Sequence, residues 1–297
     1  MMSSTAGRRS RLPSVIAIFG PTASGKSAVA EAIAERTPAE LVSADSMQIY
    51  RGLPILTNQD AHARLVGIWP LDRQGTVGEF QTLAHEAIDE IVAAGRTAVV
   101  VGGSGLWFQA ALTGVRLPPD VPADARARWE RLYDRHGAAV AHRLLEARDP
   151  RAAAQVHPND RKRVVRALEL WQAGGTLVPE QPRLWSAELR LPTLVAGLDV
   201  PRETLETRIR ARTATMFEQG VEEEVRAAGD VVPQVLGLDA VRELPRPEAI
   251  AELERGTLRF AAYQRKWMRR IPGIVMIDAD RPVGEVADAI LEVARTR

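Results

Sequence analysis

The stretch VIAIFGPTASGKSAVA, Val15–Ala30, decides how this chain begins to fold. Its first five residues form an unbroken apolar run, which predicts a buried strand, and the pattern from Lys26 to about Arg36 predicts a helix. The eight residues between them, Gly20–Ser27, match the motif G-x-x-x-x-G-K-[ST] at every fixed position. A strand, a glycine-rich turn and a helix in this order predict a phosphate-binding loop.

The chemistry of this loop follows from its residue types. Glycines let the backbone curl, and the helix that follows directs its positive end at an anion. Lys26 adds a mobile positive charge, and Ser27 is placed to hold Mg²⁺, the cofactor that we expect. The predicted diphosphate-binding residues of the loop are Gly20, Pro21, Thr22, Ala23, Ser24, Gly25, Lys26 and Ser27. The motif alone leaves open whether the ligand is a nucleoside triphosphate or another phosphate ester.

The rest of the chain predicts an α/β fold. Short apolar runs such as TAVVVGG, residues 97–103, alternate with helical patterns such as Thr82–Gly95, which favours a parallel sheet with flanking helices. Proline-rich sequence then precedes an arginine-rich helical region. We therefore predict a P-loop NTPase-like core interrupted by a helical insertion domain. The predicted segments are a disordered leader at 1–12, the core at 13–115 and 194–297, and the insertion at 116–193.

Composition limits the class of protein. The 297 residues carry a formal net charge of +1 and include no cysteine, which excludes disulfides and thiolate metal sites. No apolar run approaches the roughly 20 residues of a membrane span. Val15–Phe19 is too short for the apolar region of a signal peptide and leads into the glycine-rich loop. We expect a cytoplasmic monomer with no membrane association and no obligate protein partner.

Two further residues are predicted to face the same cleft as the loop. Asp45 follows the apolar strand in ELVSAD, and Ser104 follows the glycines that end the strand in VVVGGSG. Ligands of open parallel sheets bind beyond the carboxyl ends of the strands. Without that context, Asp45 could equally be a capping residue, and the second segment a plain strand-to-helix turn.

In combination these motifs are more specific. The loop, SADSMQIYRGL, VVVGGSGLW and VHPNDRKRVVRALEL follow one another in this order, and the chain resembles the tRNA dimethylallyltransferases (tRNA isopentenyltransferases) from about residue 15 to residue 270. The resemblance implies transfer of a dimethylallyl group from dimethylallyl diphosphate to N6 of the adenosine 3′ of the anticodon in tRNA. The loop would then hold the diphosphate that leaves.

The resemblance also implies roles for particular residues. An adenine N6 amine is a weak nucleophile, so a carboxylate that accepts its proton is needed, and Asp45 is the candidate. The departing diphosphate gains negative charge, which cations can stabilise. Arg212 matches the family's arginine at the diphosphate, and Arg208 lies one helical turn before it. The implied catalytic residues are Asp45, Arg212, Lys26 and Ser104, and Arg208 joins the diphosphate-binding set.

Two basic clusters predict the RNA-binding side. RKRVVR, residues 161–166, and QRKWMRR, residues 264–270, concentrate positive charge in a chain that is nearly neutral overall, although either could be an ordinary solvated face. The residues that the resemblance implies at tRNA are Asp45, Ser46, Met47, Gln48, Lys162, Arg163, Val164, Val165, Arg166, Gln264, Arg265, Lys266 and Trp267.

The chain departs from the family at a few places. LPILTNQD, residues 53–60, replaces the family's Gly-Thr-Ala-Lys segment, and Leu238 and Asp239 replace an aromatic residue and a base. Two other functions stay open: prenylation of free adenine nucleotides, which would need no basic insertion, and a P-loop kinase or NTPase, in which Asp45 and Arg212 would serve a triphosphate.

Overall fold

The computed structural model describes residues 12–114, 121, 123–177, 188–231 and 233–296, and they fall into two compact units. The first unit joins Met1–Gly114 to Glu188–Arg297, and the second falls within Val115–Ala187. Apart from Leu12, the predicted leader lies outside the described residues. No helix in the described ranges has the length and apolar composition needed to cross a membrane.

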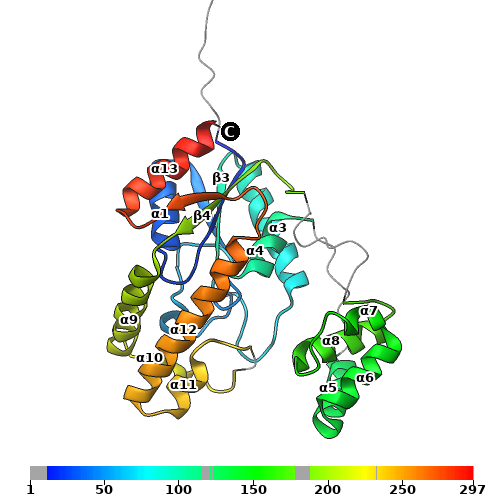
Figure 1. Ribbon diagram of the computed structural model, residues 1–297. Coiled ribbons are helices and arrows are strands. Elements are labelled where there is room, and N and C mark those ends of the chain that lie inside the picture. The colour runs from blue at the N-terminus through cyan, green and yellow to red at the C-terminus, as the bar shows by residue number, and fades with distance from the viewer. Residues whose placement is uncertain (1–11, 115–120, 122, 178–187, 232, 297) are drawn as a thin grey trace, which may run out of the picture. The chain divides into compact units, whose positions relative to one another are not determined.

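A five-stranded parallel sheet organises the first unit (Figure 1). Its strands lie in the order β2-β3-β1-β4-β5, with Val15 of the central strand aligned with Ala98 on one side and Thr193 on the other. The predicted parallel α/β fold is therefore confirmed. The strand bounds are β1 Val15–Phe19, β2 Ala39–Ser43, β3 Thr97–Gly102, β4 Thr193–Asp199 and β5 Val275–Asp278.

Helices cover both faces of this sheet. Alternate residues of β1 point to opposite sides, and because both sets are apolar, each face needs a cover. Ile16 and Ile18 belong to one apolar cluster with helices α1 (Lys26–Arg36) and α13 (Val283–Thr296). Ala17 and Phe19 belong to the other cluster, with α3 (Val77–Ala93) and α4 (Gly105–Leu112). Figure 1 shows these two helix layers on either side of the strands. With both faces buried, the polar ligands of the unit can approach only at the strand ends.

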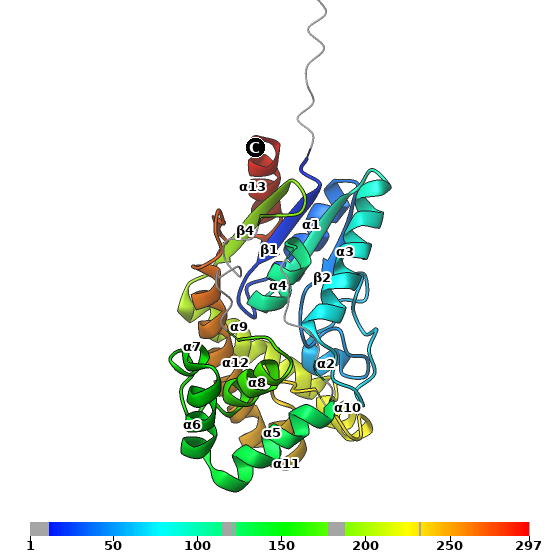
Figure 2. The same ribbon diagram turned by 90° about the vertical axis from the view of Figure 1, so that its right-hand side faces the viewer.

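A further group of helices lies beyond the carboxyl ends of the strands (Figures 1 and 2). Its longest member spans Arg246–Met268, and only its last five residues belong to a predicted feature, the basic cluster at 264–270. The bounds of this group are α2 Pro54–Thr57, α9 Arg202–Glu218, α10 Val221–Ala227, α11 Leu238–Glu243 and α12 Arg246–Met268.

Helix α3 begins five residues before the predicted start at Thr82. Its N-terminus is a capping box: the Glu79 backbone N–H donates to Thr76 Oγ1 at 3.2 Å, and the Thr76 N–H donates to Glu79 Oε2 at 2.8 Å. Such reciprocal bonds satisfy N–H groups that a helix start leaves open. The T-x-x-E pattern at residues 76–79 was therefore the missed signal.

The second unit is a helical bundle with its own apolar core, formed by residues such as Trp129, Leu145 and Leu168. Its helices are α5 Ala123–His136, α6 Ala138–Arg148, α7 Pro150–Ala153 and α8 Arg161–Gln172.

The end of the predicted insertion needs a correction. Residues 188–193 belong with the first unit rather than with the insertion, because the Arg190 N–H donates to the Leu112 carbonyl at 3.0 Å and the Arg190 guanidinium pairs with Asp89 at 2.6 Å.

A carboxylate from α10 holds the N-terminus of α2, and we expect this contact to stabilise the fold. Glu224 of α10 accepts hydrogen bonds from the Ile55 and Leu56 N–H groups at 2.7 and 2.8 Å. Glu224→Ala would leave both N–H groups without this acceptor and should lower the free energy of unfolding by about 1–3 kcal/mol.

Urea unfolding followed by circular dichroism measures this change. Glu223→Ala is the matched control, because the neighbouring Glu223 is exposed and has only a 3.9 Å contact to Arg226, so its effect should stay within about 0.5 kcal/mol. Equal effects of the two substitutions would contradict the assignment.

Candidate active site

The phosphate loop curls between β1 and α1 through two residues in the left-handed backbone region. Gly25 has a φ of 86° and Ala23 a φ of 65°. Glycine adopts such angles freely, whereas a residue with a side chain rarely does. Ser24 is buried within the loop, and α1 begins at Lys26. The positive N-terminal end of α1 therefore directly follows the loop.

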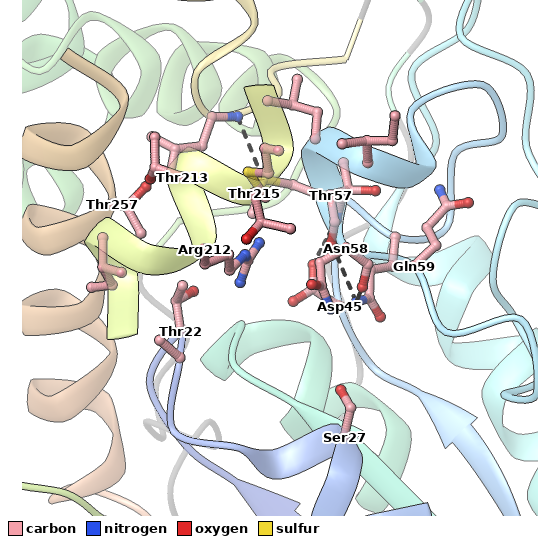
Figure 3. A pocket seen from close by; sticks show the side chains of 18 of the residues that line it. Thr22, Ser27, Asp45, Thr57, Asn58, Gln59, Arg212, Thr213, Thr215 and Thr257 are labelled. Atoms are coloured by element: carbon pink, nitrogen blue, oxygen red, sulfur yellow. Dashed lines mark hydrogen bonds between the residues drawn. The ribbon is translucent and has the colours of Figure 1, made fainter. Parts of the chain in front are cut away.

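The loop forms one wall of a cavity of about 760 Å³ in the first unit (Figure 3). Other walls come from the segment after β2, from α2, from α9 and from α12. The predicted site residues that line it are Thr22, Ala23, Gly25, Lys26, Ser27, Asp45, Met47, Gln48, Arg208 and Arg212. The structure thus brings together the residues after β1, the residues after β2 and the arginines of α9.

Three charged residues that line the cavity interact with one another. Burial lowers the pKa of Lys26 to about 8; the Asp45 carboxylate opposes this shift, and the Arg212 guanidinium adds to it. Burial also lowers the pKa of Arg212, and Asp45 again opposes the change. Lys26, Asp45 and Arg212 therefore interact electrostatically around one space. Arg208 and Glu31 also line the cavity, so its lining carries three cations and two carboxylates, and this balance favours an anionic ligand.

The Asp45 carboxylate is held in place by its own turn. Its Oδ1 accepts a hydrogen bond from the Met47 N–H at 2.9 Å, a bond typical of an aspartate two residues before its donor. Gln48 fixes the same segment: its Oε1 accepts from Ser43 Oγ at 2.9 Å, and its Nε2 donates to the Asn58 carbonyl at 2.6 Å. The amide of Gln48 is thus engaged within the protein, which does not favour the predicted RNA contact.

The remaining walls of the cavity combine polar side chains, such as Thr57, Thr213 and Thr257, with apolar ones. Leu236 and Leu253 line it together with Met47, Met216 and the α2 residues Ile55 and Leu56. The Leu236 N–H lies 3.4 Å from Met47 Sδ, and Glu224 holds α2 as described above. The cavity therefore has charged side chains next to the phosphate loop and a group of apolar side chains elsewhere. Asp45 also lines it.

Five residues predicted in the phosphate loop and after β2 and β3 do not line the cavity. Ser104 is the N-cap residue of α4, so it marks a helix start, and it is not among the residues that line the cavity. Ser46 lies next to Asp45 but outside the lining. Gly20, Pro21 and Ser24 belong to the phosphate loop but are not among the residues that line the cavity. A Cβ on Gly20 would lie 2.5 Å from Ser24 Oγ, so this position requires glycine.

Arg208 lines the cavity and also forms an ion pair with Asp280. It lies one turn before Arg212 on α9 and lines the cavity, but its guanidinium is 3.4 Å from Asp280 Oδ1. Asp280 is partly exposed, so this pair leaves Arg208 able to turn toward a ligand with little energetic penalty.

Helix α8 of the second unit carries the first predicted basic cluster. Lys162 and Arg163 are exposed, and Arg166 lies 3.4 Å from the buried Glu169. Val164 and Val165 were predicted to contact RNA, and this is wrong for their side chains: they are 0% and 2% exposed in the core of the bundle. The helical period turns them inward and leaves the basic residues outside.

Helix α12 carries the second cluster, and one prediction there also needs correction. Gln264 is 1% exposed, and its Oε1 accepts the Thr22 N–H of the phosphate loop at 2.7 Å, so its side chain does not face RNA. Trp267 is partly buried beside Gly105, and Arg265 lies 3.4 Å from Asp199 Oδ1. Only Lys266 of the four predicted residues is fully exposed.

Other residues that line the cavity were not predicted, and most of them come from residues 54–59, from α9 and from α12. They are Ala28, Glu31, Pro54, Ile55, Leu56, Thr57, Asn58, Gln59, Ile209, Thr213, Thr215, Met216, Gln219, Leu236, Leu253 and Thr257. For α12 a signal existed, because Ala249, Leu253, Thr257, Ala261 and Gln264 recur at spacings of three and four. Residues 54–59 carry no comparable pattern.

A bound Mg²⁺ fits the donors that this cavity offers. The Ser27 hydroxyl lines the cavity and has no hydrogen-bond partner within the described ranges. The described part of the chain contains no cluster of three or more histidine, aspartate or glutamate side chains placed to bind a metal. Such a site suits Mg²⁺, which retains water and takes oxygen ligands from a phosphate rather than from a protein cage.

Comparisons with known proteins show the family of this chain. The IPP transferase family pattern matches residues 48–271. The tRNA dimethylallyltransferase of Salinispora arenicola is 38% identical over 94% of this chain and 86% of its own length. That of Acidothermus cellulolyticus is 36% identical over 100% of this chain and 97% of its own length.

Solved structures give the same result. The tRNA isopentenylpyrophosphate transferase of Bacillus halodurans is similar with a TM-score of 0.66 and 29% identity, covering 95% of this chain and 97% of its own. A eukaryotic dimethylallyltransferase acting on tRNA has a TM-score of 0.73 and 25% identity, covering 89% of this chain and 73% of its own. The matched range includes Arg208 and Arg212 of α9 and the whole of α12, and this chain belongs to the IPP transferase family.

Proposed function

We propose that this protein transfers the dimethylallyl group of dimethylallyl diphosphate to N6 of the adenosine 3′ of the anticodon in tRNA and releases diphosphate. The observation that carries the proposal is a single cavity lined by a phosphate loop, a carboxylate and an apolar wall. The similar tRNA dimethylallyltransferases of Salinispora arenicola and Acidothermus cellulolyticus support the same reaction.

The charged part of the cavity suits a diphosphate that leaves. When the bond between the dimethylallyl carbon and the diphosphate oxygen breaks, the electron pair stays on the oxygen. Lys26, Arg212 and the N-terminal end of α1 would stabilise this growing charge. Mg²⁺ on Ser27, when bound, would neutralise part of the same charge.

Asp45 is the group that would accept the proton. The new bond joins adenine N6 to the dimethylallyl carbon, and N6 loses one proton as it forms. The turn that orients Oδ1 toward the Met47 N–H leaves the carboxylate one further oxygen for the amine. The apolar wall formed by Leu236, Leu253 and Met216 would receive the hydrocarbon chain and exclude water.

The exposed basic residues of α8 would contact the RNA backbone. Lys162 and Arg163 present their charge on the outside of the second unit, and Asp160 caps the helix through the Arg163 N–H at 3.1 Å. Contacts of this kind bind phosphates of any sequence, so they would hold the tRNA while the cavity selects the base.

The direct test is incubation of the protein and Mg²⁺ with labelled dimethylallyl diphosphate and unmodified tRNA. We expect label in tRNA at the adenosine, and none in free AMP or ATP offered separately. Label in the free nucleotide instead would identify a nucleotide prenyltransferase, and ATP hydrolysis without any transfer would identify a P-loop NTPase.

Asp45→Asn should reduce the transfer rate by about 100- to 10,000-fold, because the amide cannot accept the N6 proton. The side-chain oxygen can still accept the Met47 N–H, so the turn should survive. Calorimetric binding of diphosphate should therefore change little. Full activity in this variant would remove Asp45 from its proposed role as a base.

Arg212→Met should lower kcat/KM for dimethylallyl diphosphate by roughly 100-fold, because one cation at the leaving group is lost. Arg210→Met is the matched control on the same helix, since Arg210 is exposed and lies 3.8 Å from Glu206. Similar losses in both variants would show that general positive charge on α9, rather than Arg212 in the cavity, assists departure.

Arg163→Gln should raise the Kd for tRNA and reduce the slope of log affinity against log salt by about 0.7–0.9, the change expected for one phosphate contact. Its KM for dimethylallyl diphosphate should not change. Arg131→Gln, an exposed arginine on α5, is the control for nonspecific charge. An unchanged salt slope for Arg163→Gln would exclude α8 from the RNA contact.

A further inference from the structure

The conformation of the phosphate loop depends on a residue far away in the sequence. The Thr22 N–H donates a hydrogen bond of 2.7 Å to Gln264 Oε1, across 242 residues. Gln264 is 1% exposed, so the acceptor end of this bond is shielded from water. A shielded amide contact of this length is strong and specific in direction.

The residue that follows Thr22 is the strained point of the loop. Ala23 has a φ of 65°, which only glycine adopts without steric penalty. Strained backbone of this kind persists only where the surroundings hold it. The next bond in the loop, from the Ser24 N–H to the Pro21 carbonyl at 3.1 Å, closes the turn from inside, so the contact from Gln264 is its support from outside.

The end of α12 that carries Gln264 is packed tightly against the loops after β1 and β3. A Cβ on Gly103 would overlap Gln264 Nε2 and lie 3.1 Å from the Gly20 carbonyl oxygen. A Cβ on Gly105 would overlap the ring of Trp267, one turn further along α12. Gln264 Nε2 has no hydrogen-bond partner within the described ranges. In that part of the chain, the bond from the Thr22 N–H to Oε1 is therefore the one hydrogen bond of this side-chain amide.

From these contacts we propose that Gln264 is a positioning residue for diphosphate binding: it fixes the Thr22–Ala23 segment so that the loop is already curled when the diphosphate arrives. The proposal rests on the proposed function only in taking the ligand to be a diphosphate. Gln264 itself touches no substrate, since it does not line the cavity. A preformed loop binds an anion more tightly because the ligand need not pay for ordering it.

The test measures binding of inorganic diphosphate with Mg²⁺ to the full-length protein by calorimetry, without tRNA and without transfer. Gln264→Met keeps the length of the side chain and removes the acceptor, and it should weaken binding by about tenfold, as expected for one lost hydrogen bond. In the transfer assay, the KM for dimethylallyl diphosphate should rise by a similar factor while the KM for tRNA stays unchanged.

A second substitution separates loop positioning from a general loss of structure. Ala23→Gly removes the steric penalty at a φ of 65°, so adding it to Gln264→Met should restore most of the lost affinity. Gln172→Met is the matched control, because it removes an equivalent side-chain acceptor, that of Trp129 Nε1 at 2.9 Å, in the second unit. It should leave diphosphate binding unchanged.

If Gln264→Met does not fold, Gly103→Ala decides the question, since its Cβ displaces the same amide from the other side. Unchanged diphosphate binding, a rise in the KM for tRNA alone, or no recovery with Ala23→Gly would each overturn the proposal. A wild-type protein that binds diphosphate but transfers no dimethylallyl group would overturn the proposed function and leave this test valid.

Discussion

The central strand β1 is covered on both faces and hydrogen-bonded on both edges, and the arrangement of the site depends on this constraint. Polar groups cannot be buried beside it without partners, so they gather where the strands end. Parallel pairing brings the ends of β1, β2 and β4 to one edge of the sheet. The loop after β1 and Asp45 after β2 therefore line one cavity, although the sequence of neither segment indicates that the other lies beside it.

The cavity gains its chemistry from bringing charges together under partial burial. The pKa of Lys26 falls to about 8 mainly because burial disfavours its charged form, and Arg212 adds to the shift while Asp45 opposes it. A diphosphate would reverse this balance by supplying negative charge beside both cations. Asp45 meanwhile keeps its position through a bond to its own backbone segment, so it need not pair with either cation to stay oriented.

Local patterns predicted much of this structure, and the failures have two different causes. The bounds of β1 and α1 follow from a short apolar run, a glycine turn and a helical period, which are all local. Val164 and Val165 were misplaced because their charged neighbours dominated the interpretation of α8, although the helical period already turns them inward. The α2 wall was missed because its conformation depends on Glu224, about 170 residues away. Packing partners of this kind leave no periodic signal.

The phosphate-loop motif therefore describes this site incompletely. The motif fixes Gly25 and Lys26, but Ala23 occupies an unfavourable conformation at a position where the motif accepts any residue. Sequence within the loop does not explain why that conformation is stable. The explanation lies in α12, whose inner side places Gln264 against Thr22 while Lys266 two residues later is exposed. One helix thus supports the loop and presents positive charge to the surroundings, which links the shape of the phosphate site to residues more than two hundred positions away.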